Sequence, residues 1–340
     1  MKHEDLNETA KALVSQGRGI LAADESTITI GKRFDRIGVE NTAENRRAYR
    51  ELLFTTKGAG QFISGVILYD ETLRQSTKAG QTFVSLLEAQ SIIPGIKVDA
   101  GAKKLAGFPG EGVTEGLDGL RERLAEYATL GAKFAKWRAV IRVGPTIPTT
   151  FCIRANAHAL ARYAALCQEA GLVPIVEPEV LMDGDHTLER CAEVTSRVHA
   201  ATFAELTRHR VQLEGMLLKP NMIIPGEMCA QQASAERVAD ATVACFRRTV
   251  PAAVPGIVFL SGGQSEQQAT ANLNAMNARH SKLPWQLSFS YGRALQQSAL
   301  DTWRGKSDDA ARAQQVYLQR ARCNGAARSG SYGPSMEAAS

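Results

Sequence analysis

The sequence predicts one (β/α)₈ barrel, the TIM-barrel architecture, with an extra helix at its N-terminus. Short apolar runs alternate along the chain with longer amphipathic stretches, which indicates parallel strands joined by helical crossovers. Eight such runs occur within 340 residues, and that number and length fit a closed barrel better than an open doubly wound sheet. No G-x-G-x-x-G motif follows the first run, which weighs against a dinucleotide-binding fold.

Each apolar run is short and unalternating, as in strands that are buried on both faces. The predicted strands cover residues 19–24, 62–68, 92–97, 134–138, 174–179, 216–219, 256–263 and 286–293. Apolar residues at helical spacing predict helices at 4–17, 42–54, 117–130, 154–170, 187–208, 234–249, 264–278 and 308–322, and Ser26 or Thr27 could cap another. We expect a barrel domain over 1–323 and a flexible tail over 324–340, because the tail has no periodicity.

Composition excludes several classes of protein. The chain is 44% hydrophobic and 22% charged with a net charge of +5, which suits an anionic small molecule, and no dense Lys/Arg run predicts a nucleic-acid partner. The N-terminus is too polar for a signal peptide, and no run is long enough to span a membrane. Six scattered cysteines without a C-x-x-C pair favour buried thiols in a reducing cytoplasm. The histidines form no zinc motif, so we expect no dedicated zinc site.

Groups able to do chemistry or to bind anions end seven of the eight predicted strands. These groups are Asp24, Lys97, Lys136, Glu177, Lys219, Ser261 and Arg293. A single charged strand end is best explained by a side chain that reaches solvent. The carboxyl ends of all barrel strands converge on one face, where active sites of this fold lie. Seven such ends therefore predict an active site there.

Lys219 is the candidate nucleophile. It follows Leu218 directly, so its amine is expected in partly dry surroundings that favour the neutral form, which can form a Schiff base with a carbonyl. Lys136 would be a second cation nearby. The neighbouring strand carries Glu177, which we expect to move the proton during loss of water, and Glu179, which we expect to hold the ammonium groups in place. Asp24 could take a proton from a substrate hydroxyl. The alternative is an interior ion-pair network that only shapes the barrel.

Two sites for phosphate are also predicted. Ser261-Gly262-Gly263 and Gly292-Arg293 end the last two strands, where barrels often bind phosphate through backbone N–H groups and one cation. A second, looser basic pocket could form from Ser26, Thr29, Lys32, Arg33 and Lys97. Two phosphate sites that flank a Schiff-base lysine imply a carbon chain phosphorylated at both ends.

At this point the motifs resemble a known family, the class I fructose-bisphosphate aldolases. The resemblance runs from about residue 10 to about residue 322. It rests on the segments 21–27 (LAADEST), 40–42 (ENT), 95–99 (GIKVD), 134–138 (FAKWR), 176–179 (VEPE), 217–222 (LLKPNM), 260–265 (LSGGQS) and 289–294 (FSYGRA).

The resemblance implies a role for each candidate. Lys219 resembles the Schiff-base lysine of the family, Glu177 its acid/base for imine formation, and Asp24 the carboxylate at the cleaved bond. Lys136 and Glu179 match supporting charges. Ser261, Gly262, Ser290, Gly292 and Arg293 match the ketose 1-phosphate pocket, and Ser26, Thr29, Arg33 and Lys97, with Arg138 as a weaker candidate, match the second pocket. The resemblance also implies a cytoplasmic homotetramer that cleaves fructose 1,6-bisphosphate without a cofactor.

The tail departs from the family pattern. Vertebrate and plant members end in a tyrosine that reaches the active site and helps to move a proton, whereas the last tyrosine here is Tyr332. The choice between bisphosphate and monophosphate substrates is therefore open at the sequence level. Two rival functions also stay open: a sugar-phosphate isomerase that uses Glu177 as a base without a covalent step, and a non-catalytic scaffold that keeps the barrel.

Overall fold

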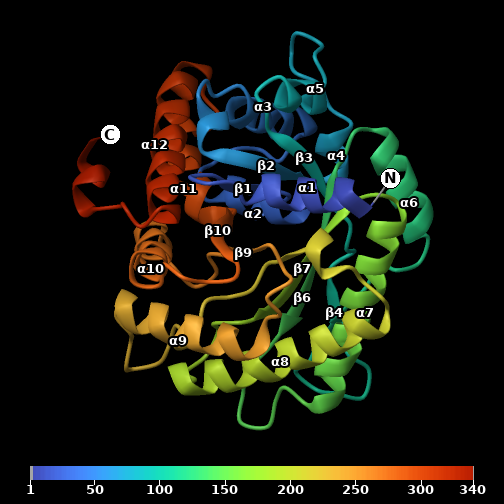
Figure 1. Ribbon diagram of the computed structural model, residues 1–340. Helices are drawn as coiled ribbons and strands as arrows, with labels where there is room; N and C mark the ends of the chain where they lie inside the picture. The colour runs from blue at the N-terminus through green and yellow to red at the C-terminus, as the bar shows by residue number, and fades with distance from the viewer. Residues whose placement is uncertain (1–2, 340) are drawn as a thin grey trace.

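The computed structural model describes residues 3–339, and the side chains of residues 5–337. Its centre is a closed barrel of parallel strands in the order β1-β10-β9-β8-β7-β6-β3-β2 (Figure 1), which confirms the predicted fold class. The barrel strands are β1 (Gly19–Ala23), β2 (Ile63–Leu68), β3 (Ile93–Lys97), β6 (Phe134–Ile141), β7 (Val173–Val180), β8 (Leu217–Leu218), β9 (Gly256–Phe259) and β10 (Gln286–Tyr291).

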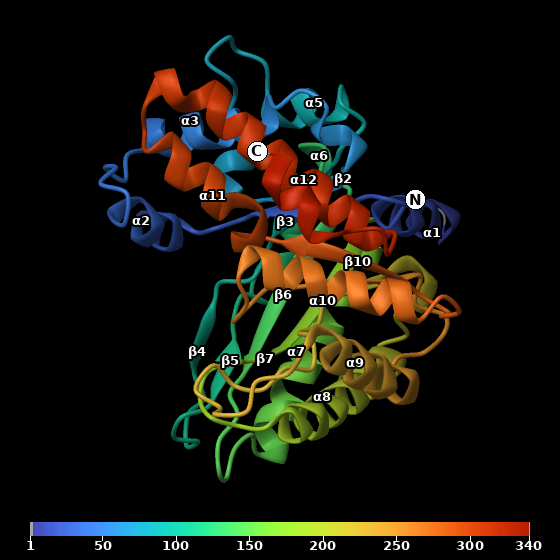
Figure 2. The ribbon, with the colours of Figure 1, turned by 90° about the vertical axis from the view of Figure 1, so that its left-hand side faces the viewer.

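Helices surround the barrel in the described part of the chain (Figures 1 and 2). They are α1 (His3–Leu13), α2 (Thr27–Asp35), α3 (Ala43–Phe54), α4 (Asp70–Leu73), α5 (Phe83–Glu88), α6 (Leu120–Thr129), α7 (Thr150–Glu169), α8 (Leu188–Arg208), α9 (Ala235–Thr249), α10 (Glu266–Arg279), α11 (Arg293–Trp303) and α12 (Ala310–Arg328). Many begin at a serine or threonine whose hydroxyl accepts a backbone N–H, as Ser26 does for α2 and Thr42 for α3.

The barrel has an inner and an outer core. The inner core is plugged by α1, whose Leu6, Ala10 and Leu13 pack with inward-facing strand residues such as Phe134 and Val258. The outer, larger core lies between the strands and the helices. Burial of α1 against one end of the barrel leaves the opposite end, where the strands terminate, to form the functional face.

The structure corrects several predicted boundaries. β8 contains only two residues because Pro220 has no N–H for the ladder, whereas β6 and β7 are longer than predicted because they pair with each other over eight residues. The antiparallel hairpin of β4 (Ala102–Lys104) and β5 (Gly112–Thr114) and helix α11 were not predicted. The strands of this hairpin are short and the strand β4 is exposed, so they carry no apolar run.

The C-terminal segment continues further as a helix than predicted. α12 extends to Arg328, so the boundary set at residue 323 falls inside it, and Cys323 to Gly325 are buried. After α12, residues Pro334–Ala339 form a 3₁₀ turn. Arg320 of α12 pairs with Glu337, whose Oε1 also accepts the Tyr332 hydroxyl at 2.7 Å. The flexibility of the remaining tail stays a prediction.

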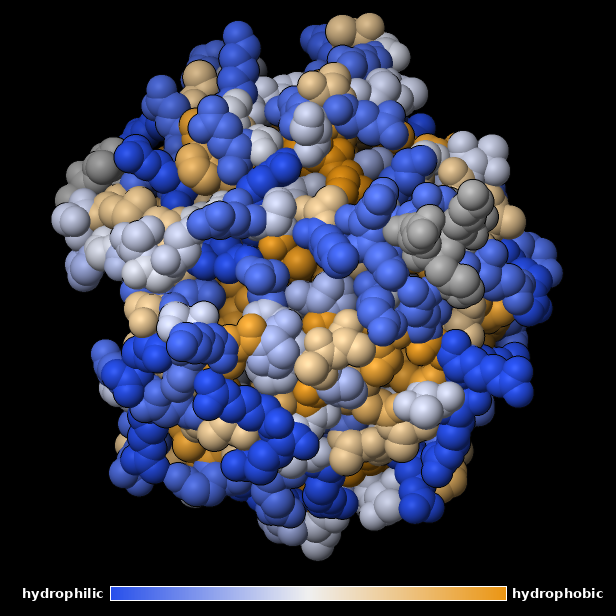
Figure 3. Space-filling view, in the orientation of Figure 1, coloured by the Kyte–Doolittle hydropathy of each residue, from blue (hydrophilic) through white to orange (hydrophobic). Residues whose placement is uncertain are grey.

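The outer surface is mainly polar on the face shown in Figure 3, with smaller apolar areas between charged groups. None of the helices within residues 3–339 combines the length and the apolar character needed to cross a bilayer.

Candidate active site

Lys219 lies at the carboxyl end of β8. Its backbone N–H donates to Val176 O at 2.8 Å, which extends the contact between β8 and β7 by one residue. Two residues on, Asn221 fixes the chain, because its Oδ1 accepts the Val180 N–H at 3.0 Å. The Lys219 side chain is only 5% exposed, and its Nζ lies 3.3 Å from Glu177 Oε1. The fold therefore holds a buried amine beside one carboxylate.

A chain of alternating charges crosses the barrel mouth from Lys219. Glu177 Oε2 lies 3.3 Å from Lys136 Nζ, and the same ammonium lies 2.6 Å from Asp24 Oδ2. Lys136 and Glu177 sit on β6 and β7, and Asp24 follows β1. Among the described residues, Glu177 Oε2 makes no hydrogen bond. Besides its ion pair with Lys136, this oxygen can therefore accept a hydrogen bond from a water or a substrate hydroxyl.

The charges of Asp24 and Lys136 are fixed by each other. Burial alone would raise the pKa of Asp24, but the ammonium groups of Lys136, Lys219 and Lys97 outweigh it and hold this pKa well below its usual range. Burial opposes the charge of Lys136 too, yet Asp24 and Glu177 raise its pKa above the usual value. Near neutral pH the pair is therefore a carboxylate and an ammonium.

Further carboxylates hold the cations at the rim. Glu179 Oε2 accepts a hydrogen bond from Arg138 Nε, and Asp99 Oδ1 lies 2.8 Å from Lys97 Nζ. Asp99 Oδ2 also accepts the backbone N–H of Arg138 at 3.3 Å. Glu179 therefore pairs with an arginine and not with a lysine, which differs from the expectation that it holds ammonium groups.

Glu25 anchors the loop that carries Asp24. Its two oxygens lie 2.5 Å from Arg33 Nη1 and 2.6 Å from Arg50 Nη2. Gln296 donates to Glu25 Oε1 at 3.1 Å and to Ala22 O at 2.7 Å. The side chains of Glu25 and Arg50 are 5% and 3% exposed. This buried network therefore holds the end of β1 and the loop after it in place.

These groups line a cavity of about 530 Å³ at the barrel mouth, a size typical of small-molecule sites. Among the described residues, eight lysines or arginines and five carboxylates line it, an excess of three positive charges. The lining contains Asp24, Ser26, Thr29, Arg33, Lys97, Lys136, Arg138, Glu177, Glu179, Lys219, Ser261, Gly262, Ser290, Gly292 and Arg293. Such a cavity suits a substrate with several negative charges.

Two parts of this lining can hold phosphate. On one side, Ser290 Oγ is buried and, within the part of the chain that the structure describes, makes no hydrogen bond. Ser261, Gly262, Gly292 and Arg293 lie in the same lining. On the other side, α2 begins at Ser26, whose Oγ lies 3.1 Å from Thr29 Oγ1. The free N–H groups of a helix start favour an anion there.

Comparison with known proteins identifies the family. The model of the family described as fructose-bisphosphate aldolase class-I matches residues 5–340. The chain is 60% identical to a probable fructose-bisphosphate aldolase class 1 of Xanthomonas campestris pv. campestris over 98% of this chain and 99% of that protein. It is 56% identical to the cytoplasmic isozyme of fructose-bisphosphate aldolase from Spinacia oleracea, over 97% of this chain and 92% of that protein. The chain belongs to the class I fructose-bisphosphate aldolase family.

The fold agrees with a solved aldolase. The Plasmodium falciparum fructose-bisphosphate aldolase, solved in complex with TRAP and a small-molecule inhibitor, superposes with a TM-score of 0.96 at 54% identity. The match covers 97% of this chain and 95% of that one. The family predicted from the motifs is thereby confirmed.

The structure brings together all but one of the predicted site residues. Gly263 lies outside the lining; at its φ of +69° it makes the turn after β9, and a Cβ there would meet Met182. Sequence reasoning missed Asp99, Glu25 and Gln297, which also line the cavity. Asp99 had a usable signal, because it stands two residues after Lys97. Tyr332 is not in the lining: its backbone N–H bonds Asn274 on α10.

Proposed function

We propose that this aldolase cleaves fructose 1,6-bisphosphate reversibly to dihydroxyacetone phosphate and glyceraldehyde 3-phosphate through an imine on Lys219. The observation that carries the proposal is the 3.3 Å approach of the buried Lys219 Nζ to Glu177 at the mouth of the barrel. Family membership supports the reaction, and the cationic lining supports a bisphosphate substrate.

Formation of the imine needs a nucleophile and a proton carrier. The Lys219 amine attacks the C2 ketone, and the resulting carbinolamine loses its hydroxyl as water while nitrogen and carbon form the iminium. Before the attack, Glu177 takes a proton from the Lys219 ammonium, and it then gives this proton to the departing hydroxyl, since its Oε1 lies 3.3 Å from Lys219 Nζ. Hydrolysis of the imine at the end of the cycle reverses these steps.

Cleavage of the C3–C4 bond needs a base and an electron sink. Asp24 takes the proton of the C4 hydroxyl, the C4–O bond becomes a carbonyl, and the C3–C4 electron pair moves into the iminium to give an enamine. Asp24 is ionised because Lys136 lies 2.6 Å from it. The iminium supplies the electron withdrawal that a metal Lewis acid would otherwise supply, so this chemistry requires no metal.

The two phosphates take the two ends of the cavity in this proposal. Ser261, Ser290 and Arg293, with the backbone at Gly262 and Gly292, bind the phosphate of the ketose C1. Ser26 and Thr29 at the start of α2, with Arg33, Lys97 and the weaker candidate Arg138, bind the phosphate on C6. Gly263 supports the first pocket only as a turn residue. We also propose, from the family resemblance, a cytoplasmic homotetramer.

The test is a coupled assay of triose phosphate release from fructose 1,6-bisphosphate and from fructose 1-phosphate, with a metal chelator present. We expect cleavage of the bisphosphate to persist in chelator and to disappear in Lys219→Met. Lys133→Met is the matched control, because Lys133 is exposed and precedes the opposite end of β6. Full activity in Lys219→Met would refute the assignment.

A further inference from the structure

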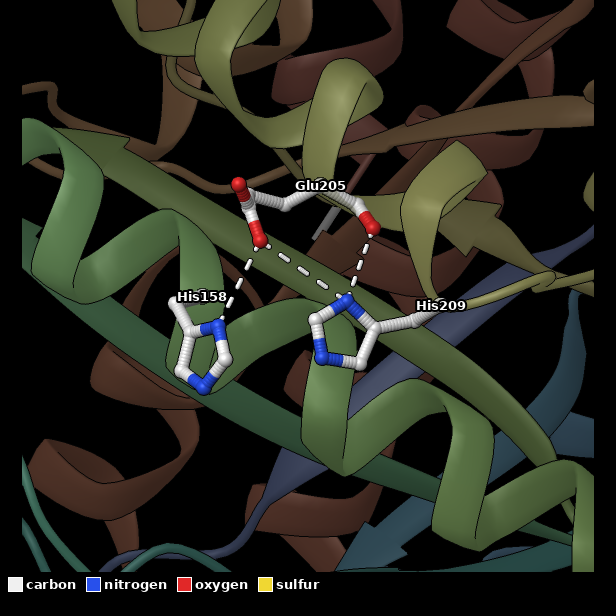
Figure 4. Close-up of side chains that lie close together, drawn as sticks. All are labelled: His158, Glu205 and His209. Carbon is white, nitrogen blue, oxygen red and sulfur yellow. Dashed lines mark hydrogen bonds and ion pairs between the residues drawn. The ribbon is translucent and has the colours of Figure 1, made fainter.

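A second group of chemically active side chains lies on the outer helices, outside the lining of the active-site cavity. It consists of His158 on α7 with Glu205 and His209 at the end of α8 (Figure 4). One ligand atom from each residue lies within 4.8 Å of the others. No other group of three histidine, cysteine or carboxylate side chains with this geometry occurs among the described residues.

The proton positions in this cluster suit a metal ligand. His209 Nδ1 lies 2.9 Å from the backbone oxygen of Glu205. A carbonyl oxygen only accepts hydrogen bonds, so Nδ1 carries a proton, and in the neutral form of the imidazole Nε2 keeps its lone pair. In Figure 4 the Nε2 edge of His209 turns toward His158. Histidine ligands of metals typically donate their other ring N–H to such a carbonyl.

Glu205 is held with one oxygen toward the two imidazoles. Its Oε1 pairs with Arg208, whereas Oε2 lies 3.3 Å from His158 Nδ1 and 3.7 Å from His209 Nδ1. The side chains of Glu205 and His209 are 17% and 22% exposed, and that of His158 is 55% exposed. The cluster is thus partly ordered by its neighbours and still open to an ion from solvent.

We propose that His158, Glu205 and His209 form a binding site for Zn²⁺ or another late first-row divalent metal ion. A site with two imidazoles and one carboxylate favours this class of ion over Ca²⁺ and Mg²⁺, which prefer oxygen ligands. His209 binds through Nε2, Glu205 through Oε2, and His158 through a ring nitrogen that exchanges its hydrogen bond to Glu205 for the metal. Water completes the coordination. The bound ion joins α7 to α8 and takes no part in the aldol reaction.

No zinc motif is visible in the sequence, because His158 comes from α7 and the other two proposed ligands come from the end of α8. Glu205 lies in the last turn of α8 and His209 caps that helix four residues later. His158 precedes Glu205 by 47 residues, and only the packing of α7 against α8 brings it near. The expectation of no zinc site rested on local spacing, which cannot detect this arrangement.

The test measures Zn²⁺ binding to the intact enzyme without a histidine tag, by competition with a chromophoric zinc chelator and by thermal unfolding with and without Zn²⁺. We expect one tight Zn²⁺ per chain and a rise in the midpoint of unfolding. The double variant His158→Asn/His209→Asn should lose the rise, and each single variant should weaken binding about tenfold or more. Activity without added zinc should not change in any of them.

The matched control is His280→Asn. His280 Nε2 lies 3.0 Å from Asp240 Oδ1 and an arginine pairs with the same carboxylate, so it reproduces one imidazole beside a carboxylate without a second histidine. This variant should bind Zn²⁺ as the unmodified chain does. Equal binding by the double variant and the unmodified chain would overturn the proposal and would assign the ion to a thiol such as Cys229. The proposal would also be overturned if His280→Asn lost as much Zn²⁺ binding as the double variant does.

Discussion

Replacement of Lys136 by methionine tests whether the charge chain at the barrel mouth is catalytic. Met keeps the length and the apolar stem of lysine but removes the ammonium that lies 2.6 Å from Asp24 and 3.3 Å from Glu177. Because burial acts to raise the pKa of Asp24 and Lys136 opposes that effect most strongly, this pKa should rise. Loss of one preorganised charge at a reacting group costs about 10²–10³ in kcat.

Stability should fall in the same variant. Removal of one partner from a buried ion pair costs about 3–5 kcal/mol, because the other charge stays buried and unpaired. Asp24→Asn in the Lys136→Met background should restore part of this loss, since it removes the stranded carboxylate. Urea unfolding gives the stabilities and the coupled assay gives kcat and its pH profile. In Lys136→Met the acid limb of that profile should move to higher pH.

The Lys133→Met variant separates a local effect from a general one. It changes the same residue type next to the other end of β6, in an exposed position, and should leave kcat and stability unchanged. The account would be refuted if folded Lys136→Met had a kcat within about twofold of this control, a change much smaller than loss of a catalytic charge causes.

Three further predictions concern other parts of the site. Arg50→Met should destabilise the protein by about 1.5–3 kcal/mol in urea unfolding, because Glu25 keeps Arg33 but loses the charged hydrogen bond from Arg50 at 2.6 Å; an unchanged midpoint would contradict this. The depressed pKa of Asp24 contributes stability that is present above about pH 4 and lost as the pH falls further, so Asp24→Asn should lose stability less steeply on acidification; identical slopes would exclude that contribution. Ser290→Ala should raise KM for the bisphosphate about tenfold without loss of stability, because its buried hydroxyl has no hydrogen-bond partner among the described residues; a lower midpoint with unchanged KM would assign it a structural role.

The strand ends explain why so much of the site was predictable from the sequence. A closed parallel barrel forces residues such as Lys136, Glu177 and Lys219, which follow separate apolar runs, onto one face. The strand register then sets which of these residues are neighbours. Arg138 stands opposite Glu177 in the ladder between β6 and β7, so the residues around them lie side by side. For these residues, the order of apolar runs was sufficient information.

Other parts of the site and of the fold could not be predicted without the three-dimensional packing. Glu25 is held by Arg50 from α3 and by Gln296 from α11, and no local pattern links these three positions. The choice of partner for Glu179 also depended on side-chain reach, because Arg138 on β6 reaches it before any lysine does. The end of α12 was missed for a similar reason, since Arg328 in its last turn donates a buried hydrogen bond to Val14 O at 3.2 Å, and no periodic pattern indicates this contact.

The position of the covalent intermediate decides whether Lys219 forms the imine. The enzyme is treated with borohydride in the presence of dihydroxyacetone phosphate, digested, and mapped by mass spectrometry. The account predicts a reduced adduct on the peptide that contains Lys219 and none in Lys219→Arg. An adduct on Lys136 or Lys97, or continued cleavage with no trapped adduct at all, would contradict it.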